Sequence, residues 1–150
     1  MKSIAITYLS FALFSFIALG LLSVPIDSEA ADKRIASKSA DVDGVQLHYL
    51  MAGQGPAVLL LHGYAETSRM WRPLIPKLAE KFTVIAPDLP GIGDSSIPPD
   101  KIDMITAAER IHALVRSLGV KKARVVGHDI GLMVAMRMQR SFLTRPRSWR

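Results

Sequence analysis

The sequence predicts an α/β fold with a mostly parallel sheet and flanking helices. Three short runs, at residues 57–61, 82–86 and 123–126, are rich in Val, Leu, Ile and Ala, which is typical of strands that are buried on both faces. The segments between these runs place apolar residues at helical spacing. Strands that alternate with amphipathic helices form parallel sheets through right-handed crossovers, so the pattern favours this fold class.

The first elements follow from local patterns. Residues 45–50 alternate apolar and polar side chains, which predicts a half-buried strand, and the glycines at 53–55 end it with a turn. After the buried strand 57–61, Thr67 or Ser68 can cap a helix whose first turns tolerate a proline. The apolar side of that helix would be formed by Trp71, Leu74, Ile75 and Leu78.

The second half of the domain repeats this alternation. The strand 82–86 leads into a loop at 89–99, where Gly, Pro, Asp and Ser are too dense for regular structure. A helix is expected from Met104 to its stop at Gly119. The third buried strand, 123–126, then runs into a further helical stretch at 132–138.

The two ends of the chain differ from this domain, which we place at residues 31–136. Lys2, an uncharged apolar stretch at 4–26 and small residues at 28 and 30 predict a secretory signal peptide over residues 1–30, cleaved after Ala30. The chain is then exported to the periplasm or secreted. The alternative is an uncleaved membrane anchor, because the apolar stretch is long enough to span a bilayer. Residues 137–150 are expected to form an aberrant basic tail.

Composition excludes several classes of function. The chain has no cysteine, so disulfides, thiolate catalysis and thiolate-bound zinc are excluded. Of the net charge of +6, residues 137–150 contribute +5 and residues 1–30 contribute −1, which leaves only +2 for the domain. We therefore expect no nucleic-acid partner. Gly91 and Gly93 lack the third glycine of a dinucleotide fingerprint, and we expect no metal and no organic cofactor.

The sharpest motif is the pentapeptide GHDIG at residues 127–131. It stands between a Val-rich strand and an apolar helical stretch, and its spacing is that of a nucleophile elbow with Asp129 as the nucleophile. The flanking Gly127 and Gly131 are needed because a Cβ there would collide with the neighbouring strand and helix. A different interpretation remains open, in which Asp129 only caps the helix that follows it.

Three segments together resemble a known family. LLLHGY at 59–64, APDLPGIGDSS at 86–96 and VVGHDIG at 125–131 are similar, in sequence, order and spacing, to the α/β-hydrolase fold family. Within that family they resemble the epoxide hydrolase and haloalkane dehalogenase branch, which has Asp at the elbow. The resemblance covers residues 37–135, or about the N-terminal half of the family's catalytic domain, so an incomplete fold is implied. A proline that is frequent in the family is replaced here by Ala65.

The resemblance implies a mechanism and assigns the site residues. Asp129 would attack carbon and form an alkyl-enzyme ester, and the backbone N–H groups of Tyr64 and Ile130 would stabilise the oxyanion during its hydrolysis. His62, next to Gly63, would shape the oxyanion loop rather than act as a base.

The substrate would be small and hydrophobic. Epoxide hydrolysis is favoured over dehalogenation, because Ile130 offers no side-chain donor to a halide. A serine hydrolase is disfavoured because the elbow contains no serine. In the family the catalytic acid and histidine lie further along the chain. We therefore expect this chain to lack them, and a catalytically inactive exported fragment remains an open alternative.

Overall fold

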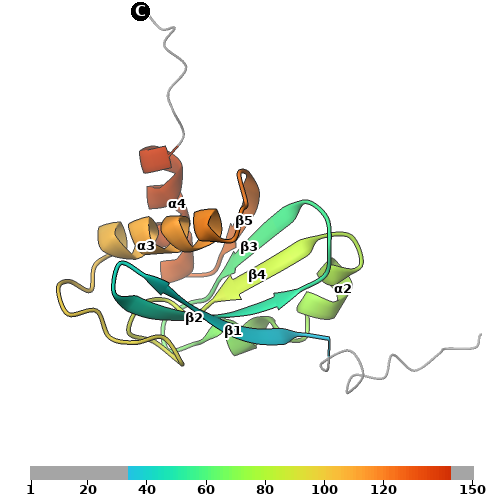
Figure 1. Ribbon diagram of the computed structural model, residues 1–150, viewed down its shortest axis with the longest axis horizontal. Coiled ribbons are helices and arrows are strands. Elements are labelled where there is room, and N and C mark those ends of the chain that lie inside the picture. Colours follow the sequence, from blue (N-terminus) through green and yellow to red (C-terminus); the bar gives the residue numbers. More distant parts are fainter. Residues whose placement is uncertain (1–33, 143–150) are drawn as a thin grey trace, which may run out of the picture.

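The computed structural model describes residues 34–142, which form a five-stranded sheet with helices on both faces (Figure 1). The strand order is β1-β2-β4-β3-β5. The predicted signal peptide and residues 143–150 of the predicted tail lie outside the described residues. No helix within the described range is long and apolar enough to cross a bilayer.

Two strands form a hairpin, of which the sequence predicted only the second strand. β1 (Ala36–Val42) pairs antiparallel with β2 (Val45–Ala52). The two turn residues, Asp43 and Gly44, have φ values of 52° and 74°, as a tight type I′ turn requires. The Asp-Gly dipeptide was the available signal for β1, whose own side chains are mostly polar and exposed.

The remaining strands form the parallel part of the sheet. β3 (Ala57–Leu61) is flanked by β4 (Thr83–Pro87) and β5 (Ala123–Gly127), and both pairings are parallel. β2 runs antiparallel to both of its neighbours, so the sheet is mixed, with the other strands of the described range running in one direction. The predicted α/β fold is confirmed, and β3 has the bounds that the sequence predicted.

The helix predicted after Thr67 is two short helices instead. Thr67 caps a 3-10 helix, η1 (Ser68–Trp71), and a separate α2 (Ile75–Ala79) follows. Pro73 and Pro76 explain the division, because each removes a backbone donor and clashes with the carbonyl of the preceding turn of a continuous helix.

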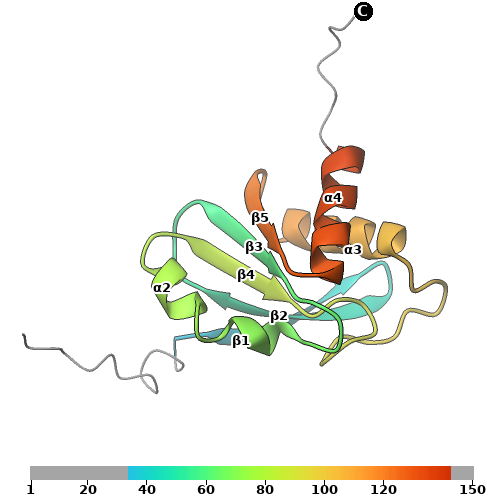
Figure 2. The ribbon, with the colours of Figure 1, turned by 180° about the vertical axis from the view of Figure 1, so that it is seen from behind.

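The two longer helices lie on the opposite face of the sheet from α2 (Figures 1 and 2). α3 (Met104–Ser117) begins at Asp103, whose side chain accepts hydrogen bonds from two backbone N–H groups, and it ends next to Gly119, which has a φ of 77°. α4 (Ile130–Phe142) continues beyond residue 136, where the sequence placed the start of the tail.

Burial follows the alternation of side chains along the strands. On the α3 and α4 face, Leu59, Leu61 and Ile85 pack with helix residues such as Leu114. On the other face, the intervening strand residues pack with Ile75 of α2. Both faces of β3 and β4 are therefore covered, which holds the carboxyl ends of these strands, and the loops that follow them, in place.

The prediction that strand 123–126 is buried is wrong. The strand is present as β5, but residues 124–126 are exposed, with 40% exposure for Val125 and 44% for Val126. The physical reason is its position: β5 is bonded only to β3 and forms one edge of the described sheet. A Val-rich strand is buried only where neighbours cover it.

Candidate active site

Asp129 lies at a sharp turn between β5 and α4. β5 ends at Gly127, α4 begins at Ile130, and Asp129 has a φ of 49°. A residue other than glycine in this left-handed region is strained by roughly 1–3 kcal/mol, and such residues cluster at functional sites. The strand-turn-helix context and the strained central residue are those of a nucleophile elbow.

The two flanking glycines allow this turn to be tight. A Cβ on Gly127 would lie 2.6 Å from backbone atoms of Gly131 and Leu132. A Cβ on Gly131 would meet the carbonyl groups of Leu61 and His62. Helix α4 therefore starts in direct contact with the backbone of β3 and β5, and only glycine fits at both positions.

One of the two expected oxyanion donors contacts the Asp129 carboxylate. The Tyr64 N–H donates a hydrogen bond to Asp129 Oδ2 at 3.0 Å, although 65 residues separate the two in the sequence. The structure contains no corresponding bond from the Ile130 N–H, which lies at the first position of α4. The carboxylate of Asp129 is exposed, so its second oxygen is accessible to solvent.

His62 supports the loop that carries Tyr64. Its ring is fully buried, with Nδ1 lying 2.9 Å from the carbonyl oxygen of Gly63, while the Leu89 N–H donates to Nε2 at 2.9 Å. Since Nε2 accepts, Nδ1 carries the proton and donates. Both ring nitrogens are occupied by backbone groups, so His62 is not available as a base in this arrangement.

The side chains of Glu66 and His128 lie on the solvent side of the same loop and contact each other. Glu66 Oε2 accepts a hydrogen bond from the Gly63 N–H at 3.1 Å and lies 3.2 Å from His128 Nδ1. A Cβ on Gly63 would collide with both side chains, so their contact requires glycine here. No local pattern in the sequence points to Glu66, since only the fold brings it to His128.

Ala65 holds a conformation that proline cannot adopt. Its φ is 56°, whereas the proline ring fixes φ near −65°, and no peptide bond in the described range is cis. The loop after His62 and Gly63 therefore makes its turn through a left-handed alanine. This conformation accounts for the absence of a proline at that position.

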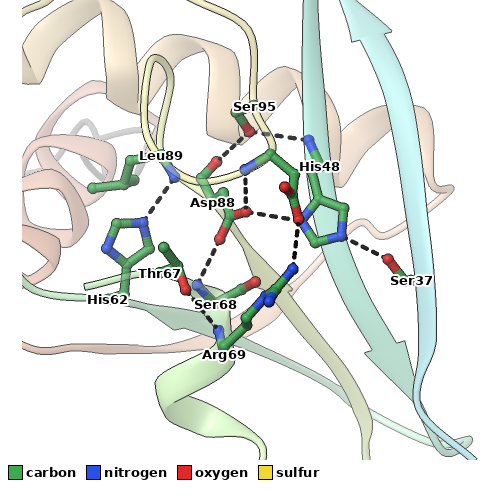
Figure 3. Close-up of polar contacts among 10 residues, drawn as sticks. Ser37, His48, His62, Thr67, Ser68, Arg69, Asp88, Leu89 and Ser95 are labelled. Carbon is green, nitrogen blue, oxygen red and sulfur yellow. Dashed lines mark hydrogen bonds and ion pairs between the residues drawn. The ribbon is translucent and has the colours of Figure 1, made fainter. Parts of the chain in front are cut away.

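A buried carboxylate, Asp88, organises the polar network beneath the loops (Figure 3). Asp88 Oδ1 accepts from the Ser68 N–H at 2.6 Å, and Oδ2 accepts from the Asp94 N–H at 2.9 Å. His48 Nδ1 lies 2.8 Å from Oδ2, while its Nε2 lies 2.7 Å from Ser37 Oγ. His48 is buried, because the pairing of β2 with β4 places it against Asp88.

The network lowers the pKa of Asp88. Burial alone would raise the pKa of this carboxyl, but hydrogen bonds from the Asp94 and Ser68 backbone N–H groups, together with His48, outweigh that effect and hold it below its ordinary value. Asp88 is therefore charged and structural.

The same cluster is the candidate for a metal site within the described residues. His48, Asp88 and Asp94 each place a possible ligand atom within 4.8 Å of the others. Both Asp88 oxygens, however, already accept N–H hydrogen bonds, and the Arg69 guanidinium lies 3.2 Å from Asp94 Oδ2. A cation would have to displace these donors, so the geometry favours a hydrogen-bonded network.

Comparison with known proteins identifies a family and several relatives. Residues 56–140, more than half of the chain, match the family model of the alpha/beta hydrolase fold. A soluble epoxide hydrolase from Corynebacterium sp. (strain C12) is 46% identical over 101 residues, which are 67% of this chain and 35% of that protein. A fluoroacetate dehalogenase from Burkholderia sp. is 39% identical over 103 residues, which are 65% of this chain and 34% of that protein.

Solved structures show the same relationship. An epoxide hydrolase from Vigna radiata superposes with a TM-score of 0.70 and 33% identity, over 73% of this chain and 37% of that one. The chain thus spans about a third of the length of the curated relatives it matches. The elbow, the loop after β3 and the family match agree, and the chain belongs to the alpha/beta hydrolase fold family.

Proposed function

We propose that the site belongs to a hydrolase in which Asp129 opens epoxides by forming an alkyl-enzyme ester. The observation that carries this proposal is the 3.0 Å hydrogen bond from the Tyr64 N–H to Asp129 Oδ2, on a carboxylate held at a strained turn. A helix cap bonds the N–H groups of its own helix. This carboxylate instead bonds a loop 65 residues away.

The hydrogen bond distinguishes the two carboxylate oxygens. Oδ1 is the nucleophile and forms a bond to one epoxide carbon, while the ring C–O bond at that carbon breaks. The oxygen released from the ring carries the electron pair and takes a proton from solvent or from an acid. Oδ2, held by Tyr64, becomes the carbonyl oxygen of the new ester.

Hydrolysis of the ester places charge on that same atom. Water adds to the Asp129 carboxyl carbon, and the negative charge develops on Oδ2, where the Tyr64 N–H already donates. Donors of this kind contribute roughly 2.7–4 kcal/mol in other hydrolases. Collapse of the intermediate breaks the bond to the alkyl oxygen, releases the diol and restores the carboxylate.

Ester hydrolysis is expected to be the slower step in this chain. Water needs a base, and within residues 34–142 the rings of His48, His62 and His128 are each engaged by another group. We expect the alkyl-enzyme ester to accumulate unless residues beyond the described range supply that base.

An epoxide fits this site better than an alkyl halide. An epoxide keeps its leaving oxygen attached to the substrate, whereas a halide ion must be stabilised as it departs, and Ile130 has no side-chain N–H for that purpose. Dehalogenation stays the second candidate, because a relative at 39% identity is named fluoroacetate dehalogenase. For the epoxide reaction the proposed substrate is a small hydrophobic molecule.

The test uses an aryl epoxide such as styrene oxide and follows two products. Intact-protein mass spectrometry measures the ester adduct, and chromatography measures the diol. We expect one adduct per chain, located on Asp129 by peptide mapping. The variant Asp129→Asn is the matched control, because it keeps the shape and the Tyr64 hydrogen bond but removes the nucleophilic charge.

The outcomes separate the candidate functions. Diol release identifies a complete hydrolase, and an adduct without diol identifies the first half-reaction alone. Halide release from fluoroacetate or chloroacetate without reaction of the epoxide would favour the dehalogenase. If the chain forms no adduct and unfolds over a broad thermal range, the inactive fragment is the correct description and the proposal fails.

A further inference from the structure

Ser37, His48 and Asp88 lie in a row that begins at the β1 edge of the described sheet (Figure 3). Ser37 Oγ lies 2.7 Å from His48 Nε2, and His48 Nδ1 lies 2.8 Å from Asp88 Oδ2. A hydroxyl thus contacts one nitrogen of an imidazole, and a carboxylate contacts the other. This order of groups activates serine as a nucleophile on unrelated folds.

The register of the β1–β2 hairpin explains why His48 reaches Ser37. Ser39 is directly opposite His48, and Ser37 is the diagonal neighbour of His48 on the same face of the sheet. Long side chains reach such diagonal neighbours. The His48 ring contacts Ser37, whereas Ser39, which is also exposed, makes no hydrogen bond to this ring. Ser39 is therefore a matched comparison for Ser37 within the same strand.

The contact with Asp88 determines which nitrogen of the His48 ring carries the proton. Asp88 is charged, because its network holds the pKa of this carboxyl below its ordinary value, and a charged carboxylate can only accept hydrogen bonds. His48 Nδ1 therefore donates to Asp88 Oδ2, which leaves Nε2 of the neutral ring as an acceptor. The Ser37 hydroxyl then donates to Nε2, so its proton already lies on the path to a base.

The base is buried, whereas the hydroxyl is accessible. His48 and Asp88 are 5% and 1% exposed, and backbone N–H groups hold the Asp88 carboxylate in place. Ser37 is exposed on β1, which has a partner strand on only one side within the described sheet. A molecule from solvent can therefore approach Ser37 Oγ while the imidazole keeps its orientation.

We propose that Ser37 is a second nucleophile, activated by His48, that takes acyl groups from esters with a good leaving group. Ser37 Oγ forms a bond to the acyl carbon while its proton passes to His48 Nε2, and the charged Asp88 stabilises the imidazolium. The bond from the acyl carbon to the leaving oxygen then breaks. The leaving group departs with the electron pair and takes the proton from His48, which leaves an ester on Ser37. This reaction is separate from epoxide opening, because neither contact involves Asp129.

The first test labels the nucleophile with a fluorophosphonate, which bonds to an activated serine oxygen as fluoride departs. Peptide mapping by mass spectrometry compares the labelling rates of Ser37 and Ser39. A positioned base contributes roughly 10²–10⁴-fold to such a step, so Ser37 should be labelled at least about a hundredfold faster than Ser39. His48→Gln should remove this difference, because the glutamine amide is not a base.

Acyl transfer itself is measured with p-nitrophenyl acetate. The release of p-nitrophenolate that depends on the protein should fall by about tenfold or more in Ser37→Ala and should stay unchanged in Ser39→Ala. Ser37→Ala should also keep the adduct of styrene oxide with Asp129. The two proposals can therefore fail independently, because each has its own nucleophile and its own probe.

A pair of exposed thiols keeps the proposal testable if His48→Gln fails to fold. The chain has no cysteine, so Ser37→Cys and Ser39→Cys each introduce a unique thiol at an exposed position of β1. A base beside a thiol raises its thiolate fraction, so iodoacetamide at pH 7 should alkylate Ser37→Cys at least about tenfold faster than Ser39→Cys. Circular dichroism verifies that both variants are folded. Equal labelling of Ser37 and Ser39, unchanged p-nitrophenolate release in Ser37→Ala, or equal alkylation of the two thiols would each overturn the proposal.

Discussion

Ala65 and Asp129 both hold left-handed backbone conformations next to the site. At Asp129 the strained residue carries a side chain that makes a specific hydrogen bond. Ala65 is exposed, and its methyl side chain cannot form a hydrogen bond. The strain at Ala65 is thus the simpler of the two to remove by substitution.

We predict that Ala65→Gly stabilises the protein. Glycine relieves a strain in the folded state of about 1–2 kcal/mol. It also makes the unfolded chain more flexible, which lowers the free energy of unfolding by roughly 0.4–1 kcal/mol. The first effect is larger, so the free energy of unfolding should rise by about 0.5–1 kcal/mol. Urea denaturation measures the change. Ala36→Gly, at an exposed strand residue with ordinary φ, is the control and should destabilise; a fall in stability for both variants would contradict the interpretation.

Asp88 gives a pH-dependent prediction. Its pKa is lower in the folded state than in the unfolded chain, so its contribution to stability is complete above the ordinary value of about 3.8 and is lost as pH falls through the lowered value. Asp88→Asn should cost about 2 kcal/mol or more at pH 7, because the amide cannot accept all of the present donors.

The measurement is urea denaturation at pH values from 7 down to 3. Asp88→Asn should also lessen the loss of stability below about pH 4, since the titrating group is gone. Asp41→Asn changes an exposed carboxylate near the end of β1 and should alter neither quantity much. An unchanged acid slope in Asp88→Asn would argue against a role for the network in stability.

At the scale of elements, the start of α4 depends on close contact with the sheet. Gly131→Ala inserts a methyl group against the carbonyl groups at the end of β3, so we expect a loss of about 3 kcal/mol. Gly44→Ala is the control, because a Cβ there meets nothing and only the backbone strain, about 1 kcal/mol, remains. Thermal unfolding compares the two variants. Similar losses of stability would mean that α4 can move away from the sheet to make room for the methyl group.

Local patterns predicted some elements well. β3 was predicted with its observed bounds because a continuous Val and Leu run is closed by polar and glycine residues. The sharp turn at Asp129 could also be predicted, since the spacing of its two flanking glycines lies within five residues. η1 and α2 were predicted as one helix because the apolar spacing is continuous and Pro73 was placed in the first turns, where proline is tolerated. In the fold, Pro73 and Pro76 interrupt the ladder of backbone hydrogen bonds.

At the scale of the whole molecule, the sequence could not show which strands become neighbours. The contact between His48 and Asp88 joins residues 40 apart and depends on the pairing of β2 with β4, which no local pattern encodes. The exposure of β5 has the same origin, because burial is a property of the assembled sheet. A strand rich in valine indicates a preference for burial and does not reveal what provides it.

Export is a further proposal at this scale. We predict that cells expressing the gene release a chain beginning at Ala31, since the apolar stretch at 4–26 and the small residues before Ala31 fit a cleaved signal. Fractionation followed by mass spectrometry of the N-terminal peptide measures this. Replacing Ala30 with a bulky residue should block cleavage, and an intact chain that remains in the membrane would support the anchor instead.

The hydrogen bonds that link the segment after Asp88 to Asp129 determine how rigid the loop at residues 62–64 is. The Leu89 N–H bonds His62, His62 bonds the Gly63 carbonyl, and the Tyr64 N–H bonds Asp129. The loop is therefore stiff where charge would form, while the Tyr64 side chain, 77% exposed, is free to vary. Substitutions of the Tyr64 side chain should change which molecules bind at the site. They should leave the positions of the Tyr64 N–H group and the Asp129 carboxylate unchanged.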